Sequence, residues 1–348
     1  MNANTQNVIG TYDVIVVGGG AAGVAAAKTA AEGGASVVLI EPTGSLGREI
    51  VRARNLFVDL SRFPDVPAAV SLLAHLEKRK GWFDGKLDTN CAAAAFDDML
   101  DEAHADVLFQ VWASGIALEG GKIRGLEVAS KSGYGFIRAP HVIDASMYGK
   151  ISRSVFKAVE NTSGRSMIRL LYNNVPEMSR REFSYIHDEY GSVNVTCEPT
   201  FWPGEWRVSL EIARLLRRDE WSGLVDASLS ILRNHAPELA DGVLTYIADD
   251  VWSTPECTLA AEGEDNGCAA VLLDRNPDDP HGTPVELGRG MLTNPKLADG
   301  LVLSGSWIEG FPAAIEQEQL AIINLFKLGE TSGKLTLESL RNKAAEIM

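Results

Sequence analysis

Three glycines near the start of the chain, Gly18, Gly20 and Gly23, have the GxGxxG spacing of a dinucleotide-binding turn. The apolar run 13–17 before them is typical of a buried parallel strand, and the alanine-rich segment 24–32 after them favours a helix. Gly18 allows a tight turn, Gly20 lets the backbone approach a diphosphate, and Gly23 lets the helix pack closely on the strand. This segment therefore predicts a dinucleotide site.

An acid follows at the distance at which such sites bind a ribose. Glu41 lies 23 residues after Gly18, at the end of a second apolar run, 36–40. Its carboxylate can accept hydrogen bonds from both ribose hydroxyls and would repel a 2′-phosphate, which disfavours NADP. Ala21 and Ala22 complete the glycine turn, and the N–H groups of the helix that begins there are expected to bind the diphosphate.

The elements that position these residues do not continue as the βαβ repeats of an NAD dehydrogenase. After the second strand the pattern becomes helical, then changes to strands that turn at glycines, and ends in a strand and a helix. In chain order we expect a helix over 91–104, a three-stranded antiparallel meander over 108–118, 122–131 and 134–137, a returning strand over 141–146, a closing strand and turn over 300–306, and a helix over 312–328.

The middle of the chain is expected to form a separate, smaller domain. We predict a nucleotide-binding domain from residues 1–151 and 291–348, and an α+β substrate domain from 152–290. The acidic segment 262–280 is rich in Asp, Asn, Pro and Gly and is predicted to be a loop; it lacks the residue order of a calcium loop, and no metal site is expected. Within the substrate domain we expect strands over 166–173 and 201–212 and helices over 220–235 and 238–247.

This arrangement resembles the FAD-binding fold of the glutathione-reductase-like (GR2) flavoproteins. Within that group the chain is most similar to the bacterial FAD-dependent oxidoreductases that carry Leu-Gly-Arg-Glu after the ribose acid and Ile-Asp-Ala-Ser in the returning strand, here residues 46–49 and 143–146. The resemblance implies an α/β fold, namely a Rossmann-like FAD/NAD(P)-binding fold with a β-meander and a smaller substrate domain. It also implies that FAD is the cofactor.

The resemblance also implies which residues contact the cofactor. The residues around the adenosine and its ribose would be Glu41, Pro42, Ala113, Ala145 and Ser146. Along the diphosphate and toward the flavin would lie Gly47, Arg48 and Glu49, in addition to the glycine turn. Gly305 and Ser306 would contact the ribityl and phosphate groups, and the helix that begins near Pro312 and Ala313 would direct its N-terminus at the flavin.

We expect an FAD-dependent oxidoreductase in which a small-molecule substrate exchanges a hydride with flavin N5. Gly288-Arg289-Gly290 follows no predicted strand, so no separate NAD(P)H domain is expected. Two alternatives remain open: a flavoprotein subunit that depends on a partner or lacks catalysis, and an NAD-binding Rossmann protein. The candidates for a catalytic role are Arg48, which could bind a substrate anion, His187, a general base, and Trp307, expected close to the flavin ring.

The composition excludes several other classes. The net charge of −15 disfavours nucleic acid and anionic membranes as partners. No apolar run is long enough to span a membrane, and the polar N-terminus lacks the features of a signal peptide, so we expect a cytoplasmic protein. The four cysteines are far apart and match no zinc or disulfide pattern. A homo-oligomer and a hetero-complex both remain open.

Overall fold

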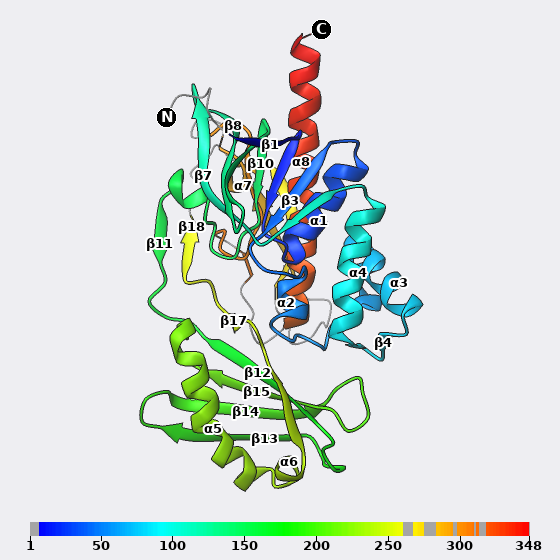
Figure 1. Ribbon diagram of the computed structural model, residues 1–348, viewed down its shortest axis with the longest axis vertical. Helices are drawn as coiled ribbons and strands as arrows, with labels where there is room; N and C mark the ends of the chain where they lie inside the picture. The colour runs from blue at the N-terminus through cyan, green and yellow to red at the C-terminus, as the bar shows by residue number, and fades with distance from the viewer. Residues whose placement is uncertain are drawn as a thin grey trace.

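A computed structural model describes residues 7–259, 267–274, 283–294, 298–309, 311–312 and 318–347 of the chain. Ala313, expected at the start of the last helix, lies outside these residues. The chain forms two bodies, with a six-stranded sheet and helices α5 and α6 in the lower one (Figure 1). No helix among the described residues is long and apolar enough to cross a membrane.

A five-stranded parallel sheet lies at the centre of the upper body, in the order β21-β10-β2-β3-β6. The strands β2, β3 and β10 are buried along their whole length, as expected for strands covered on both faces. The predicted strands at 13–17, 36–40, 141–146 and 300–306 are confirmed, with small changes in their ends. The bounds are β2 Val14–Val17, β3 Val37–Glu41, β6 Asp106–Phe109, β10 His141–Asp144 and β21 Leu301–Leu303.

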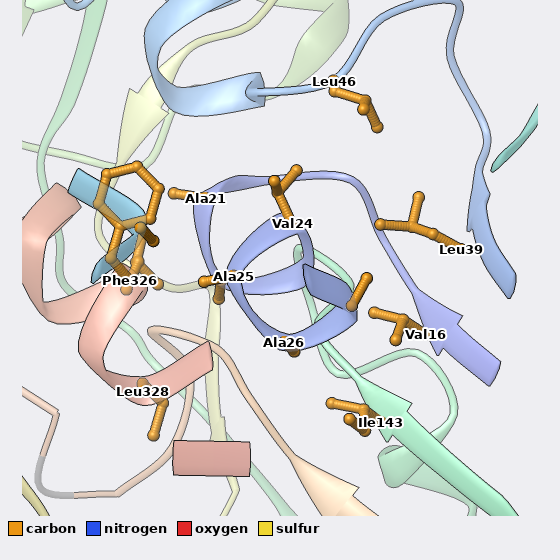
Figure 2. Close-up of a cluster of buried hydrophobic side chains, with 14 of the residues drawn as sticks. Val16, Ala21, Val24, Ala25, Ala26, Leu39, Leu46, Ile143, Phe326 and Leu328 are labelled. Atoms are coloured by element: carbon orange, nitrogen blue, oxygen red, sulfur yellow. The ribbon is translucent and has the colours of Figure 1, made fainter. Parts of the chain in front are cut away.

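Helix α1 (Ala21–Glu32) packs between this sheet and the last helix, α8 (Glu318–Ile347). The helices approach closely because Gly329 of α8 lies against the Ala22 carbonyl, where a Cβ would overlap it. Figure 2 shows the alanines of α1 between the sheet residues and Phe326 of α8. The prediction that the last helix ends at residue 328 was wrong, because Gly329 serves this close packing and does not terminate the helix.

The meander was predicted correctly, but its first strand is two strands. Gln110, with φ 58°, turns the chain between β6 of the parallel sheet and β7 of the meander. The N-terminal strand β1, which was not predicted, pairs in parallel with β9. The bounds are β1 Val8–Thr11, β7 Val111–Glu119, β8 Lys122–Ser130 and β9 Gly133–Arg138.

Short helices cover the edge of the upper body beside α1. The helix expected over 91–104 is α4, and its N-cap Asp88 accepts a hydrogen bond from the Cys91 N–H. These elements are α2 Arg48–Val51, the 3₁₀ turn Leu60–Arg62, α3 Pro67–Lys78, β4 Trp82–Phe83, β5 Lys86–Leu87 and α4 Thr89–Glu102.

The lower body is an antiparallel sheet ordered β13-β14-β15-β12-β16, with β17 also paired to β12. Strand β12 is confirmed, and β15 is shorter than predicted because Gly204, with φ 75°, turns the chain before it. The helix predicted over 238–247 is confirmed only over 238–241, and residues 243–247 form a strand instead. The bounds are β12 Ser166–Asn173, β13 Arg181–His187, β14 Gly191–Pro199, β15 Trp206–Ile212, α5 Trp221–His235, α6 Glu238–Asp241, β16 Val243–Ile247 and β17 Trp252–Ser253.

The acidic segment expected to be a loop contains a strand. Strand β19 (Cys268–Asp274) pairs with β20 (Thr283–Gly288), so Gly288 does follow a strand, although this strand belongs to an antiparallel hairpin and not to a βαβ unit. The hairpin packs on α8, where the Asn324 side chain bonds the N–H and the carbonyl of Leu273, both at 2.8 Å. The hairpin leads into α7 (Arg289–Leu292), and the pair β11 (Ala158–Glu160) and β18 (Cys257–Leu259) links the two bodies.

Two hydrophobic clusters stabilise these bodies. The first core contains the parallel sheet, α1, α8 and the hairpin residues Ala270, Leu272 and Leu287. The second core lies between the six-stranded sheet and α5 and includes Leu210 and Leu224. The hairpin therefore packs with the parallel sheet, although it lies within the segment expected to form the substrate domain.

Candidate cofactor site

A cavity of about 440 Å³ opens at the carboxyl ends of β2, β3 and β10, beside the first meander strand. It joins the two halves of the predicted motif, since the glycine turn and the ribose acid both line it. Of the residues predicted to contact the cofactor, those that line this cavity are Gly18, Gly20, Glu41, Pro42, Arg48, Glu49, Ala113, Ala145 and Ser146.

The glycine turn has no room for side chains at two of its positions. Gly18 has φ 102°, and a Cβ there would lie 2.6 Å from the Ala145 carbonyl oxygen. A Cβ at Gly23 would overlap the Gly18 carbonyl oxygen. At Gly20 the nearest atom is the carboxylate of Glu49, at 2.7 Å from the ideal Cβ position. Gly18 and Gly23 thus shape the turn itself. The absence of a side chain at Gly20 leaves room for an anionic group, which in this structure is the Glu49 carboxylate.

Ala21 and Ala22 are buried in the first turn of α1, directly after the glycine turn, and neither lines the cavity. Gly47 lies outside the cavity lining. It has φ 69°, its missing side chain leaves room for the Phe96 ring, and it is the N-cap of α2. Its role is to start the short helix that carries Arg48 and Glu49.

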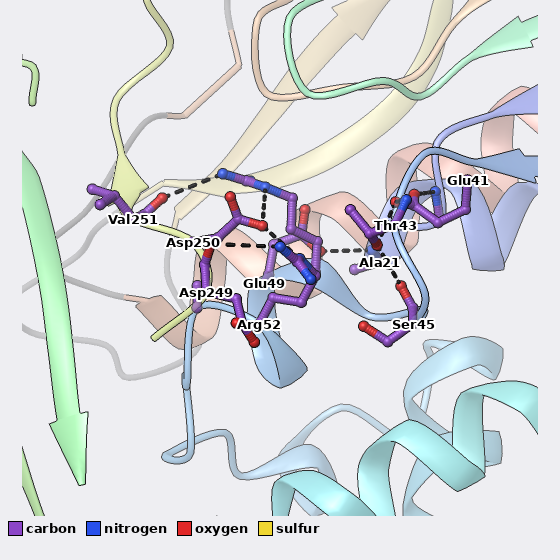
Figure 3. Close-up of polar contacts among 12 residues, drawn as sticks. Ala21, Glu41, Thr43, Ser45, Glu49, Arg52, Asp249, Asp250 and Val251 are labelled. Carbon is purple, nitrogen blue, oxygen red and sulfur yellow. Dashed lines mark hydrogen bonds and ion pairs between the residues drawn. The ribbon is translucent and has the colours of Figure 1, made fainter. Parts of the chain in front are cut away.

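Glu41 lies at the end of β3, as predicted, and is only 7% exposed. Its Oε2 accepts a hydrogen bond from the Gly19 N–H at 2.7 Å, and its Oε1 accepts bonds from the Thr43 N–H and hydroxyl at 2.8 and 2.7 Å (Figure 3). A carboxylate has about four acceptor positions, so it can still bind a ribose hydroxyl while it fixes the turn.

Glu49 reaches across from α2 to the start of α1. Its Oε2 accepts a hydrogen bond from the Ala21 N–H at 2.8 Å, and the residue is 8% exposed (Figure 3). The Ala21 N–H is one of the unpaired donors of the α1 N-terminus, which carries a partial positive charge. The carboxylate therefore lies where the motif is expected to bind a diphosphate.

An ion-pair cluster connects α2 to the six-stranded sheet. Asp250 pairs with Arg52 at 2.8 Å and with Arg48 at 3.6 Å, and the Arg48 Nη2 donates to the Val251 carbonyl at 3.3 Å (Figure 3). Asp250 was not predicted as a site residue. It lies 198 residues from Arg52 and directly after a segment read as a helix, so the sequence carried no signal for it.

A second, smaller pocket of about 40 Å³ lies beyond Arg48 and Glu49, which line both spaces. It is lined by Ser306 and by residues of α8 and β17, and the expected contact of Ser306 with the ribityl and phosphate groups stays a prediction. Pro312 is half-buried and lies next to Phe311, which lines this pocket. Arg48 and Glu49 therefore separate the two ends of the candidate site.

Trp307 is 1% exposed, and its indole N–H donates to the Ser146 carbonyl at 2.6 Å. Gly305 leaves room for that ring, because a Cβ there would overlap the indole nitrogen. Trp307 thus joins the turn after β21 to the turn after β10, and it lines neither of the two pockets at the candidate site. The expectation that it faces a flavin ring is not supported.

His187 is not brought to the site. It ends β13 in the hairpin of the six-stranded sheet, its Nδ1 accepts the Glu189 N–H at 3.2 Å, and its ring lies 5.0 Å from that of Tyr190. These contacts are local to one hairpin. They give His187 no place among the residues that line the cavity.

Asp144, at the end of β10, is a fully buried acid that holds the turn after the strand. Its Oδ1 accepts the Ser146 hydroxyl at 2.6 Å, and its Oδ2 accepts the N–H groups of Ile151 and Ser152 at 3.0 and 2.7 Å. This network places Ala145 and Ser146 against the glycine turn. Sequence reasoning used the Ile-Asp-Ala-Ser motif but did not assign this role to its acid.

The charges that line the larger cavity suit a ligand with a negatively charged centre. Four basic residues face three acids there, namely Arg48, Arg52, Lys150 and Arg218 against Glu41, Glu49 and Asp250. Tyr148 also lines the cavity, and burial, with Glu256 nearby, raises the pKa of Tyr148 to about 12. Its hydroxyl therefore remains a protonated donor at neutral pH.

A separate cavity of about 240 Å³ lies between the six-stranded sheet and the segments around residues 54–56 and 87–90. Arg54 lines this cavity and is 7% exposed. Its backbone is left-handed, with φ 55°, and its guanidinium lies 3.7 Å from the centre of the Tyr246 ring. It donates to the Thr89 hydroxyl, and among the described residues it forms no ion pair.

Groups of three or more His, Cys, Asp or Glu residues that could hold a metal are absent from the described part of the chain.

Comparisons with known proteins agree with this geometry. Residues 13–169 match the family described as FAD dependent oxidoreductase. No curated protein sequence matches the chain. The description of this family names FAD, and the glycine turn, the ribose acid and the cavity fit its adenosine and diphosphate.

Three solved structures illustrate the shared fold. A geranylgeranyl bacteriochlorophyll reductase-like protein from Thermoplasma acidophilum is 19% identical with a TM-score of 0.63, over 96% of this chain and 79% of that one. A flavoprotein/dehydrogenase from Cytophaga hutchinsonii is 16% identical with a TM-score of 0.61, over 95% and 79%. The anhydrotetracycline hydroxylase OxyS from Streptomyces rimosus is 11% identical with a TM-score of 0.57, over 93% and 62%.

At these identities the likeness shows the fold alone, and the reactions of the three proteins differ. The family match covers four of the five strands of the parallel sheet (β2, β3, β6 and β10), the glycine turn, the meander strands β7 to β9 and the first half of β12. Residues 13–169, a little under half of the chain, match the FAD dependent oxidoreductase family, and FAD is the cofactor that this match supports.

Proposed function

We propose that this protein is an FAD-dependent oxidoreductase of the GR2 type that exchanges a hydride with a small-molecule substrate. When bound, FAD supplies the group that accepts and returns a hydride, at N5 of its flavin ring. The observation that carries the proposal is the continuous cavity from the meander residue Ala113, past Glu41 and the glycine turn, to Arg48.

Each part of the cavity has a residue suited to one part of the cofactor. Glu41 would accept a ribose hydroxyl, and the N-terminus of α1 would bind the diphosphate. Lys150 and Arg218 add positive charge at the cavity wall, and the Tyr148 hydroxyl is a donor. Ser306 and Pro312 support a flavin position at the other end, beyond Arg48.

We also propose that the six-stranded sheet forms the substrate domain, with the hairpin 268–288 assigned to the cofactor domain by its packing on α8. The 240 Å³ cavity supports a small-molecule partner, and Arg54, in a lining that also contains Asp88 and Glu205, favours an anionic group beside its guanidinium. A buried guanidinium without an ion pair is costly, and a carboxylate or phosphate would offset that cost.

The first test measures the binding of FAD and of NAD to the purified protein, by flavin fluorescence and by calorimetry. FAD is expected to bind, and Glu41→Gln is expected to weaken it about tenfold by removing the charge that faces the ribose hydroxyls. Gly44→Ala, on the same loop but with open space around it, is the matched control and should have no effect. Binding of NAD with no binding of FAD would contradict the proposal.

The second test addresses catalysis. The FAD-loaded protein is mixed without oxygen with small carboxylates and phosphates, and the flavin absorbance is followed. Loss of the flavin absorbance with one compound would identify a reductive substrate. If dithionite reduces the flavin but none of the compounds does, and a purified partner protein restores reduction of the flavin by one compound, the partner-dependent alternative is correct.

A further inference from the structure

Glu49 occupies the position that a dinucleotide diphosphate needs. Its Oε2 accepts the Ala21 N–H at 2.8 Å, and its Oε1 lies 2.7 Å from the ideal Cβ position of Gly20. The helix N-terminus and the bare face of the second glycine are the two features that bring a diphosphate to this turn. The carboxylate uses both of them (Figure 3).

The charge of Glu49 has no basic partner to balance it. Among the described residues no ion pair includes Glu49, although its neighbours Arg48 and Arg52 both pair with Asp250. The residue is 8% exposed, so water screens its charge poorly. The start of α1, a helix of 12 residues, is therefore the positive group that stabilises the carboxylate.

A diphosphate and this carboxylate cannot share the helix end. Both are anions, and both would accept the same N–H at hydrogen-bond distance, where two like charges repel strongly in a poorly solvated site. The position of Glu49 on the short helix α2 allows its side chain to turn. It also lines the 40 Å³ pocket, where Ser253 and Thr254 provide a polar environment.

We infer that Glu49 is an internal competitor of the cofactor diphosphate. Its carboxylate holds the anion position at the start of α1 and leaves this position when FAD binds. The inference rests on the proposed function, because it assumes that FAD occupies this cavity. It assigns opposite roles to the two acids of the turn. Glu41, which bonds the Gly19 N–H, favours FAD binding, whereas Glu49, which bonds the Ala21 N–H, opposes it.

The test compares wild type with Glu49→Gln, which keeps a hydrogen-bond acceptor for Ala21 but removes the charge. The dissociation constants of FAD, ADP and adenosine are measured by calorimetry at one salt concentration. We expect Glu49→Gln to bind FAD and ADP about tenfold more tightly, because charged acceptors hold a donor more strongly than neutral ones. Adenosine, which has no phosphate, should bind equally well to both proteins.

The control for the general change in net charge is Glu177→Gln, an exposed residue in the loop between β12 and β13, which should leave all three constants unchanged. Equal or weaker FAD binding by Glu49→Gln would overturn the inference and leave the proposed function intact, since the wild type still binds FAD. Binding by the variant alone would support the inference. Binding of FAD by neither protein would overturn both proposals.

A second variant uses stability as the readout. Glu49→Ala leaves the Ala21 N–H without its acceptor, so the variant without FAD should unfold at a lower temperature than wild type. Because the diphosphate then replaces the missing acceptor without competition, the rise in melting temperature on adding FAD should be larger than in wild type. An equal or smaller rise would contradict the inference.

Discussion

The two cores of the molecule tolerate charge differently. The first core contains the glycine turn and the alanine-rich face of α1, and the charged side chain fully buried beside it is an acid, Asp144. The six-stranded sheet, by contrast, buries Arg169 completely and leaves Arg207 only 5% exposed. Side-chain size limits which residues fit into the first core, whereas the six-stranded sheet uses buried arginines to contact the upper body.

Those cations act on the backbone beside α2. The Arg169 guanidinium donates to the Ala53 carbonyl at 2.6 Å, and Arg207 donates to the Arg54 carbonyl at 3.3 Å. Together with the Asp250 cluster, they hold the segment that directly follows Glu49. The first core thus supplies the cofactor turn, while the six-stranded sheet fixes the helix α2, which carries the competitor Glu49.

The largest effect is expected for Gly23→Val. The new side chain would overlap the Gly18 carbonyl, so the variant should lose about 4 kcal/mol or more of unfolding free energy, above the usual range for an overpacked core, and should bind no FAD. Urea unfolding and flavin content measure both losses. Gly44→Ala, in open space, should match wild type. A stable Gly23→Val protein with full flavin content would show that size does not limit this core.

Leu210→Ala should separate the two regions. Leu210 is fully buried in the second core, and its truncation should lower the unfolding free energy by about 3 kcal/mol through loss of packing and a residual cavity. Affinity for FAD below the melting temperature should change less than twofold, because the cofactor turn belongs to the first core. A large loss of FAD affinity at a temperature where the protein is folded would contradict the division.

A third effect concerns pH and the first core. Burial, and to a smaller extent nearby Lys343, lowers the pKa of His141 at the start of β10 to about 4. The unfolded chain, with a histidine pKa near 6.5, therefore binds a proton first as the pH falls. Stability from neutral His141 is complete above pH 6.5 and should be lost between pH 6.5 and 4, by about 3 kcal/mol.

This loss is measured by urea unfolding at several pH values for wild type and His141→Gln, which cannot titrate. The difference in unfolding free energy between the two proteins should change across that pH range, since carboxylates that titrate below pH 5 affect both equally. Parallel curves would mean that the first core accepts a charged imidazole.

The smallest effect is expected where the two regions meet. Asp250→Asn removes the common partner of Arg48 and Arg52, whose side chains are about one fifth exposed. The loss in unfolding free energy should be about 1 kcal/mol, because these pairs are partly solvated. Chemical denaturation at low and high salt measures it, and the difference from wild type should shrink at high salt. A salt-independent loss would indicate packing and not charge.

Local patterns predicted much of the first core. The strand at β2, the glycine turn and Glu41 follow from residue types within 30 positions, because a buried parallel strand needs β-branched residues and the turn needs glycines. The assignment of 238–247 as a helix holds for 238–241 and was wrong for the rest. Residues 243–247 form a strand only because they pair with β12, some 70 positions earlier in the chain, and no local pattern encodes that partner.

The amino-acid sequence by itself determined that a dinucleotide turn exists and which acid ends its second strand. The tertiary structure alone decided that Asp250 meets Arg52, that Trp307 is buried, and that Glu49 reaches the start of α1. The physical reason is the distance along the chain over which each kind of interaction acts. Backbone preferences and side-chain size act within a few residues, whereas ion pairs and helix-end contacts depend on segments that only folding brings together.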